Sequence, residues 1–224
     1  MNAKKMAALK ACEHIKAGST IGLGTGSTAY YAIKRIAKLI QEGMNLKAVA
    51  TSRISEQLAH ENNIPLYSLN DVEKIDLTID GADEVDHELN GIKGGGGALL
   101  REKIVATAST TNIWIVDESK QVNTLGRFPL AVEVVSFGHE VIKRKLGTFA
   151  KEIILRKEQD GKIFMTDNGH YIYDLHIGKI DNPWELQQEL ERIPGVVTDG
   201  LFLDIADIVM IGMQDGTVKE VLRK

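Results

Sequence analysis

Residues 19–41, STIGLGTGSTAYYAIKRIAKLIQ, predict a strand, a glycine-rich loop and a helix in direct succession. The segment 19–23 has the length of a short strand. The loop at 24–28 holds only glycine, serine and threonine, and the apolar residues beyond it recur at helical spacing up to about Gln41. A strand that runs through such a loop into a helix is typical of an α/β sheet.

The same alternation continues on both sides of this unit, as far as about residue 120. The predicted helices lie at 3–17, at 53–61 behind a cap at Ser52, and from the glycine run 94–97 to about Ala108; the predicted strands lie at 46–50, near Leu66, at 75–79 and at 112–116. Strands that alternate with helices at this spacing imply a mainly parallel sheet with helices on both of its faces.

The rhythm changes after Gly126. The predicted elements are strands at 128–137, 152–157, 162–166 and 170–177 with a turn at 167–169, helices at 138–149 and 183–193, the latter capped by Asp181, and a strand after 194–195. This mixture predicts a smaller α+β domain. Because the apolar segment 208–213 is expected to return to the main sheet, the small domain is an insertion. We therefore predict one domain from 1–126 and 200–224, and a second from 127–199.

The composition excludes several classes of protein. Of the 224 residues 43% are apolar and 26% are charged, which is the balance of a folded globular chain. The net charge is −4, so the basic footprint of a nucleic-acid-binding protein is missing. There is no run of about 18 apolar residues, and charged residues interrupt the first 16, so neither a membrane span nor a signal peptide is expected. Cys12 is the only cysteine, which excludes an intrachain disulfide. We expect a cytoplasmic protein whose partner is neither nucleic acid nor a membrane.

The first glycine loop has the features of an anion site. Its two glycines allow the backbone to approach a ligand closely, and Thr25, Ser27 and Thr28 add hydroxyl donors. The free N–H groups and the positive dipole end of the following helix point at the same loop. A small phosphate ester fits such a site, whereas a plain strand-to-helix turn would need no ligand.

A dinucleotide is the alternative ligand of this loop. Residues 24–29 match the loose pattern G-x-G-x-x-A, but no carboxylate follows at 50–53 to hold a ribose hydroxyl. Arg53 could receive a 2′-phosphate, so NADP remains an open alternative. A Walker P-loop is excluded, because no lysine precedes Ser27 or Thr28.

Two carboxylates follow the predicted strand 75–79. Asp80 lies at its carboxyl end, where ligands bind in open α/β sheets, and Asp83 comes three residues later behind a glycine. These two acids are therefore candidates for a site. The next three acids, Glu84, Asp86 and Glu88, are expected to form a solvated acidic loop.

A second glycine run, 94–97, follows Lys93 and precedes a helix that carries Glu102. Consecutive glycines are entropically costly, so close backbone approach to a ligand explains the run better than a linker does. Glu102 shares its helix face with apolar residues, so we expect it to face inward. A partly desolvated carboxylate suits a general base, whereas an ordinary surface ion pair with Arg101 or Lys103 is the alternative.

Taken together, these motifs form an ordered pattern. They are ThrGlySerThr at 25–28, AspGlyAlaAsp at 80–83, LysGlyGlyGly at 93–96, LeuLeuArgGluLys at 99–103 and SerLysGln at 119–121. The pattern resembles the ribose-5-phosphate isomerase family, type A, and the resemblance extends to ProGlyValValThr at 194–198. Each motif is modest alone, but their order along nearly the whole chain is specific.

The resemblance implies an aldose–ketose isomerase of the pentose phosphate pathway that needs neither metal nor other cofactor. Glu102 matches the family's general base, which would move a proton between C1 and C2 through a cis-enediolate, and Asp80, Asp83 and Lys93 match its other catalytic positions. The implied substrate-binding residues are Thr25, Gly26, Ser27, Thr28, Gly81, Ala82, Gly94, Gly95, Gly96 and Lys120. The implied fold is a Rossmann-like domain with an inserted α+β domain, assembled as a homodimer or homotetramer around a small-molecule sugar phosphate site.

Two positions depart from the family pattern. Ala131 stands where relatives often carry a proline, which puts a turn in doubt, and the segment 202–207 lacks an arginine found in some relatives. Three alternatives to the isomerase also stay open. His170, Asp174 and His176 share strand parity and could bind a metal. Glu102 could instead be the nucleophile of an acyl transferase, and the chain could be a non-catalytic sugar-phosphate sensor.

Overall fold

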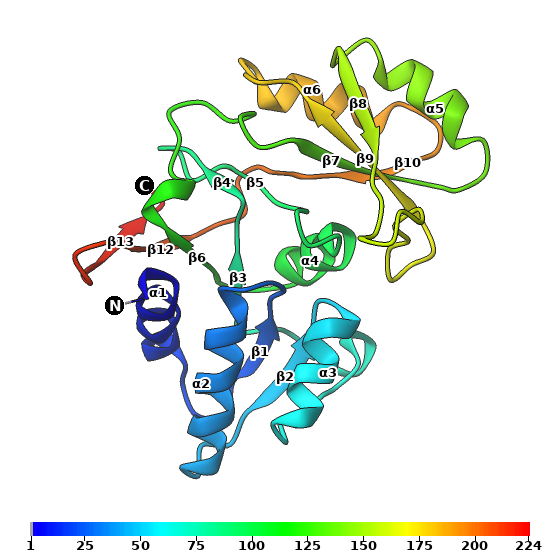
Figure 1. Ribbon diagram of the computed structural model, residues 1–224. Helices are drawn as coiled ribbons and strands as arrows, with labels where there is room; N and C mark the ends of the chain where they lie inside the picture. The colour runs from blue at the N-terminus through cyan, green and yellow to red at the C-terminus, as the bar shows by residue number, and fades with distance from the viewer. Residues whose placement is uncertain (1) are drawn as a thin grey trace. The chain divides into compact units, whose positions relative to one another are not determined.

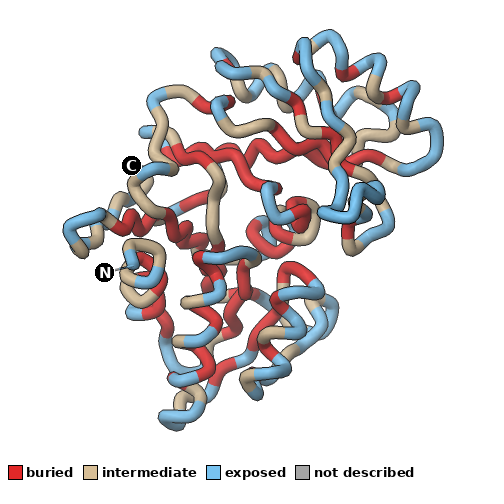
Figure 2. Tube along the Cα trace, in the orientation of Figure 1, coloured by how far each residue is buried: buried red, intermediate tan, exposed pale blue. Residues whose placement is uncertain are grey.

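The computed structural model describes residues 2–224, and its contacts divide the chain into two compact units (Figure 1). The first unit comprises the residues up to Ala82, Arg101–Gln121 and Asp204–Lys224; the second comprises Asp83–Leu100 and Val122–Leu203. In both, buried residues concentrate along the strands (Figure 2). The sequence-based boundary places 83–100 with the first domain instead, and the domain assignment stays a prediction.

The first unit is built on a six-stranded sheet with the order β13-β12-β6-β3-β1-β2. The strands are β1 (Thr20–Leu23), β2 (Lys47–Ala50), β3 (Leu77–Gly81), β6 (Asn112–Asp117), β12 (Ile208–Gly212) and β13 (Val218–Leu222). Every pairing is parallel except that of β13 with β12. The predicted mainly parallel sheet is confirmed, and the segment after 208 does return to it. The edge strand β13 was not predicted from the sequence.

Helices cover both faces of this sheet, as predicted. They are α1 (Ala3–Ala11), α2 (Ala29–Gln41), α3 (Arg53–Glu61) and α4 (Leu99–Thr107), with single 3-10 turns η1 (Cys12–His14), η2 (Leu69–Asp71) and η3 (Glu118–Lys120). Ile21 and Leu23 of β1 join the core formed with α1 and α2. Gly22 points to the opposite face, where a Cβ would lie 2.9 Å from Cγ1 of Val105 on α4. The Ser52 hydroxyl accepts a hydrogen bond from Ser55 N, so the predicted cap of α3 is confirmed. No helix among residues 2–224 is long and apolar enough to cross a membrane.

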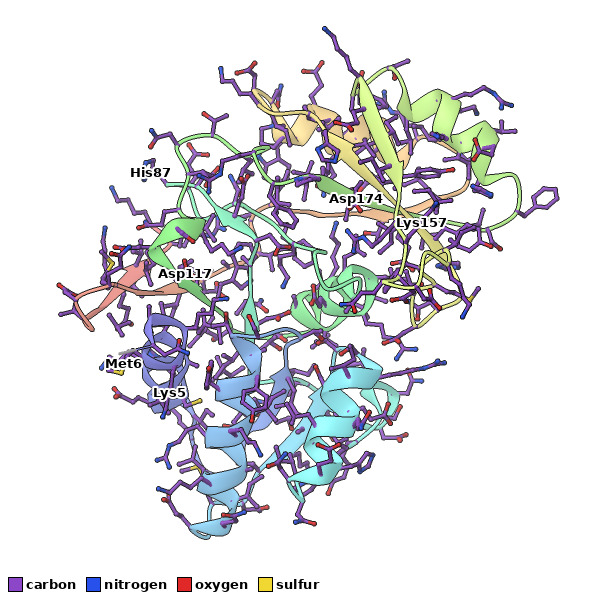
Figure 3. All side chains as sticks on the ribbon, in the orientation of Figure 1. Lys5, Met6, His87, Asp117, Lys157 and Asp174 are labelled. Carbon is purple, nitrogen blue, oxygen red and sulfur yellow. The ribbon has the colours of Figure 1, made fainter. Side chains whose placement is uncertain are left out.

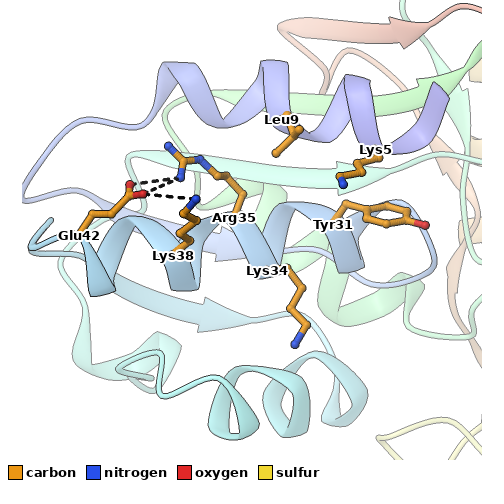
Figure 4. Close-up of a pocket in the computed structure, with 7 residues that line it drawn as sticks. All are labelled: Lys5, Leu9, Tyr31, Lys34, Arg35, Lys38 and Glu42. Atoms are coloured by element: carbon orange, nitrogen blue, oxygen red, sulfur yellow. Dashed lines mark hydrogen bonds and ion pairs between the residues drawn. The ribbon is translucent and has the colours of Figure 1, made fainter. Parts of the chain in front are cut away.

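A basic groove of about 670 Å³ lies between α1 and α2 (Figure 4). Its lining residues are Lys5, Leu9, Tyr31, Lys34, Arg35, Lys38 and Glu42. The Glu42 carboxylate accepts a hydrogen bond from Arg35 at 3.2 Å and pairs with Lys38 at 3.8 Å. Two of the four cations are therefore partly neutralised from within the groove.

The second unit contains two antiparallel sheets. The larger has the order β10-β7-β9-β8, with β7 at Leu130–Val134, β8 at Glu152–Leu155, β9 at Tyr171–His176 and β10 at Val196–Asp199. The smaller has the order β11-β5-β4, with β4 at Glu84–Val85, β5 at Gly91–Ile92 and β11 at Leu201–Phe202. Helices α5 (His139–Leu146) and α6 (Pro183–Glu191) complete the unit, and Leu146 and Leu190 anchor them in the core of the larger sheet.

Two local predictions in this unit are wrong. Segment 162–166 is not a strand; it makes a single bridge, Lys157 to Ile163, because its backbone bends to bring the Thr166 hydroxyl to Glu133. Helix α6 is capped by Asn182, whose side chain accepts from Glu185 N, rather than by Asp181. Ala131 lies inside β7, within the predicted strand 128–137.

Candidate active site

Four neighbouring strands of the first unit end at the same edge of the sheet, because they run parallel. The first glycine loop follows β1, Thr51 and Ser52 follow β2, Asp80 ends β3, and Lys120 follows β6 in η3. The chain leaves β1 toward β2 on one side and returns to β3 on the other, so the strand order reverses between β1 and β3. Ligands of open α/β sheets bind at such a reversal.

Asp80 is locked against the first glycine loop at this point. Its side chain is 3% exposed, and its Oδ1 accepts hydrogen bonds from Thr25 N at 2.9 Å and from Gly81 N at 2.7 Å. A Cβ at Gly24 would lie 2.2 Å from the same oxygen, so only glycine fits there. The carboxylate thus fixes the backbone of the loop.

The hydroxyl of Thr25 faces a cluster of other hydroxyls. It lies 2.8 Å from Thr51 Oγ1, donates to Ser52 Oγ at 2.7 Å, and lies 3.0 Å from Ser55 Oγ. Ser55 in turn donates to the carbonyl of Gly24 at 2.6 Å. These bonds tie the loop to the start of α3 and leave Gly26 and Ser27 exposed at its tip.

The tip of the loop meets a cation that the sequence analysis missed. Lys4 of α1 donates from Nζ to Ser27 Oγ at 3.1 Å. The next residue, Thr28, occupies the N-cap position of α2. The loop therefore has both a lysine ammonium and the N-terminus of a helix next to it, and both carry positive charge. Lys4 lies 23 residues before Ser27, and no local motif connects the two.

A hollow of about 380 Å³ borders the same loop. It is lined by Gly24, Gly26, Ser27, Tyr30, Tyr31, Ile33, Ile54, Ser55 and Leu58. The loop contributes its backbone and the Ser27 hydroxyl to this lining, and the hydroxyls of Tyr30, Tyr31 and Ser55 come from α2 and α3.

Glu102 is buried in the first turns of α4, with 5% of its surface exposed. Val105 and Ala106 on the same helix are also buried, which confirms that this face points inward. Helix α4 connects the parallel neighbours β3 and β6, so it must run back across the sheet, and its N-terminal turns begin at the edge where Asp80 lies. An ordinary surface pair of Glu102 with a neighbouring cation does not fit this burial.

In the second unit, Asp83 holds the second glycine loop as Asp80 holds the first. Gly95 N donates to Asp83 Oδ2 at 2.8 Å. The run forms a turn closed by a hydrogen bond from Gly97 N to Gly94 O at 3.0 Å, with φ of +109° at Gly94 and +77° at Gly97. These two angles explain why glycine is required at both ends of the turn.

Lys93 precedes this turn and is itself buried, with 3% of its surface exposed. Its Nζ lies 5.2 Å from the centre of the Phe202 ring, and its backbone N donates to Gly200 O at 2.9 Å. A desolvated ammonium next to an aromatic face is a strong local source of positive charge.

Glu84 contradicts the predicted solvated acidic loop. Its side chain is buried, with 0% of the residue exposed, and its two oxygens accept from Gly126 N at 2.8 Å and Phe128 N at 2.7 Å. The prediction was wrong because both donors lie more than 40 residues away in the sequence. Asp86 serves a local turn by accepting from Glu88 N and Asn90 N, while Glu88 is exposed.

The metal alternative on β9 does not hold. His170 Nδ1 lies 2.9 Å from Oε1 of the buried Glu133, and Asp174, labelled in Figure 3, is bound by Arg156. No group of three or more His, Cys, Asp or Glu side chains suited to a metal occurs within the part of the chain that the structure describes. His170 and Asp174 use their side chains for hydrogen bonds to Glu133 and Arg156 within the second unit.

The sequence and the structure of this chain are both similar to those of known proteins. Residues 47–216 match the family model of ribose 5-phosphate isomerase A, also called phosphoriboisomerase A. The chain is 50% identical to ribose-5-phosphate isomerase A of Listeria innocua over the full length of both proteins. It is 49% identical to that of Streptococcus pneumoniae over 216 residues, which is 96% of this chain and 95% of the relative. A solved D-ribose-5-phosphate isomerase in complex with phospho-erythronic acid is 40% identical and covers both chains fully, with a TM-score of 0.94.

The fold and the edge of the sheet therefore define an aldose–ketose isomerase that acts on a sugar phosphate. The chain belongs to the ribose 5-phosphate isomerase A family. Its reaction interconverts ribose 5-phosphate and ribulose 5-phosphate, a step of the pentose phosphate pathway.

Proposed function

We propose that Glu102 is the general base of this isomerisation. It takes the proton from C2 of the open-chain aldose and returns it to C1 of the resulting cis-enediolate, and no metal takes part. The observation that carries the assignment is a buried carboxylate on α4, whose first turns start at the edge of the sheet where β1 and β3 diverge. Positioned acid–base catalysis of this kind contributes roughly 10²–10⁴-fold.

Asp80, Asp83 and Lys93 handle the oxygens of the sugar in this proposal. Ring opening and proton exchange between O1 and O2 need a carboxylate that can accept and return a proton, and both aspartates are held by backbone N–H groups. The developing enediolate is an anion, so the buried ammonium of Lys93 and the N–H groups of the second glycine loop stabilise it.

The phosphate belongs to the first glycine loop. The helix N-terminus, the exposed tip of the loop and the Lys4 ammonium supply dipole, N–H donors and charge at one place. The proposed substrate contacts are Thr25, Gly26, Ser27, Thr28, Gly81, Ala82, Gly94, Gly95, Gly96 and Lys120. Phospho-erythronic acid, bound by a relative, carries a phosphate and a carboxylate, and that carboxylate stands in for the negatively charged enediolate.

The same family resemblance supports a cytoplasmic protein that forms a homodimer or homotetramer. In either assembly, its partner is a small-molecule sugar phosphate. Sedimentation equilibrium distinguishes these states, and a concentration-independent monomer would contradict both.

Replacement of Glu102 by Gln tests the assignment, because it keeps the size and polarity of the side chain but removes the base. The kcat for ribose 5-phosphate is expected to fall at least ~10²-fold, with the melting temperature close to that of the unchanged protein. Glu88→Gln, at an exposed carboxylate, is the matched control and keeps full activity. The assay is repeated with a chelator, which should leave the rate unchanged. Near-normal turnover by Glu102→Gln would reject the base, and a glutamyl hydroxamate formed with hydroxylamine and acyl-CoA would favour acyl transfer instead.

A further inference from the structure

An ion pair in the second unit is connected directly to the second glycine loop. Arg156, just after β8, binds Asp174 of β9 through two parallel hydrogen bonds, from Nε to Oδ2 at 2.9 Å and from Nη2 to Oδ1. The two side chains are 13% and 19% exposed. A bidentate pair of this kind fixes the plane of the guanidinium and leaves its third nitrogen, Nη1, aimed in a defined direction.

That third nitrogen reaches the turn. Arg156 Nη1 donates to Gly94 O at 2.6 Å and approaches Gly95 O at 3.4 Å. Gly94 O already accepts the hydrogen bond from Gly97 N that closes the turn, so this carbonyl is held by two donors. The arginine therefore acts on the geometry of the turn itself, 62 residues away in the sequence.

The opposite end of the same peptide group is held as well. The peptide that joins Gly94 to Gly95 places its carbonyl and its N–H on opposite sides. Arg156 holds the carbonyl and Asp83 accepts from the N–H at 2.8 Å, so a cation and an anion fix one peptide plane from both sides. By the same trans geometry, Gly96 N–H points away from Gly95 O and hence away from Arg156.

Packing around the turn limits its remaining freedom. A Cβ at Gly94 would lie 2.9 Å from Ala131 Cβ, and a Cβ at Gly97 would lie 2.3 Å from Cζ of Phe164. The Phe164 ring also lies 5.8 Å from the Arg156 guanidinium carbon. Consecutive glycines have more conformational freedom than any other run of residues, so without such restraints the turn would sample many arrangements.

We propose that Arg156, anchored by Asp174, is a positioning residue that fixes the second glycine loop so that the N–H of Gly96 is presented to the enediolate. This inference rests on the proposed role of the loop in stabilising that anion. The N–H acts mainly where negative charge develops, so its misplacement lowers kcat more than it raises KM. Asp174 acts one step further out, by holding the arginine.

Arg156→Ala is the test, with Arg144→Ala, an exposed arginine on α5, as the matched control. We expect Arg156→Ala to lower kcat at least about tenfold with little change in KM, since small displacements of catalytic groups cost up to about 10²-fold. The dissociation constant for phospho-erythronate should rise by a similar factor, whereas that for inorganic phosphate, the probe for the first loop, should stay the same. Arg156→Lys keeps one donor and should recover part of kcat, and Asp174→Asn should show a smaller loss of the same kind.

Other outcomes contradict the proposal. A fall in melting temperature with unchanged kcat and unchanged phospho-erythronate binding would leave the ion pair a purely structural role. If Arg156→Ala does not fold, Asp174→Asn decides the matter, and normal kinetics of that variant would overturn the inference. Failure here is distinct from failure of the proposed function, because Glu102→Gln would still be inactive if only the role of Arg156 is wrong.

Discussion

The two glycine loops are held by the same kind of interaction, but different groups surround them. In each, an aspartate accepts a hydrogen bond from a backbone N–H of the loop, Asp80 from Thr25 and Asp83 from Gly95. The first loop is then supported by hydroxyl groups at the start of α3, whereas the second is supported by the Arg156–Asp174 ion pair. A carboxylate can therefore fix the backbone of a loop in addition to any role in the reaction. The hydroxyl groups around the first loop and the ion pair beside the second loop then determine how rigidly each loop is held.

The difference explains why one loop could be predicted in detail and the other could not. The first loop belongs to one continuous strand–loop–helix segment, so the proposed anion site can be predicted from residues 19–41 alone. The turn at 94–97 needs positive φ at two glycines and a partner 62 residues away. Its sequence shows that it is unusual without showing what holds it.

The largest expected effect comes from placing a methyl group in the first loop. Gly24→Ala brings a Cβ to 2.2 Å from Asp80 Oδ1 and 2.5 Å from Asp80 Cα, and the backbone of β3 cannot withdraw. We expect kcat/KM to fall about 10²-fold. Gly95→Ala meets only the ends of the Asp83 and Phe128 side chains, at 2.8 and 3.0 Å, and should cost about tenfold.

Steady-state kinetics of the two variants at equal folded fraction measure this contrast. Gly43→Ala is the control: a Cβ there meets nothing within 4 Å, but φ is +96°, so this variant carries backbone strain away from both loops and should lose stability while keeping full activity. A larger loss in Gly95→Ala than in Gly24→Ala would reverse the comparison and make the second loop the more rigid one.

The candidate site was predicted more completely than its support. Asp80 at the end of a strand and Glu102 on an inward helix face follow from strand ends and helical spacing, and both are buried. Glu84 was mistaken for a solvated acid, because sequence alone does not show that Gly126 and Phe128 direct N–H groups at it. Segment 162–166 has strand-like residues, but its tertiary bond to Glu133 overrides that preference.

Substitution of Glu84 tests whether this carboxylate stabilises the second unit or takes part in the reaction at the second glycine loop. Glu84→Gln leaves one oxygen for two N–H donors, a buried one at Gly126 and a partly buried one at Phe128, and an unsatisfied buried donor costs about 1–3 kcal/mol. We expect chemical denaturation to show a loss of about 2 kcal/mol, while kcat of the folded protein stays within about threefold of normal.

Glu88→Gln is again the control, and its stability should change by no more than about 0.5 kcal/mol. If Glu84→Gln were as stable as the unchanged protein, its carboxylate would be replaceable as an acceptor. If it lost catalysis without losing stability, Glu84 would belong to the chemistry beside Asp83.

The smallest expected effect comes from removing Lys4, the cation at the first loop. The corresponding cation of the second loop is the buried Lys93. Lys4→Ala removes the donor 3.1 Å from Ser27 Oγ. A charge-assisted hydrogen bond contributes roughly 1.5 kcal/mol, so KM for ribose 5-phosphate should rise about tenfold with kcat nearly unchanged. Lys5 is the adjacent lysine of the same helix but lines the groove of Figure 4 instead, so Lys5→Ala should leave KM unaltered. Equal increases of KM in both variants, abolished by high salt, would show that α1 attracts the phosphate only through its general positive field and that Lys4 makes no specific contact with the phosphate.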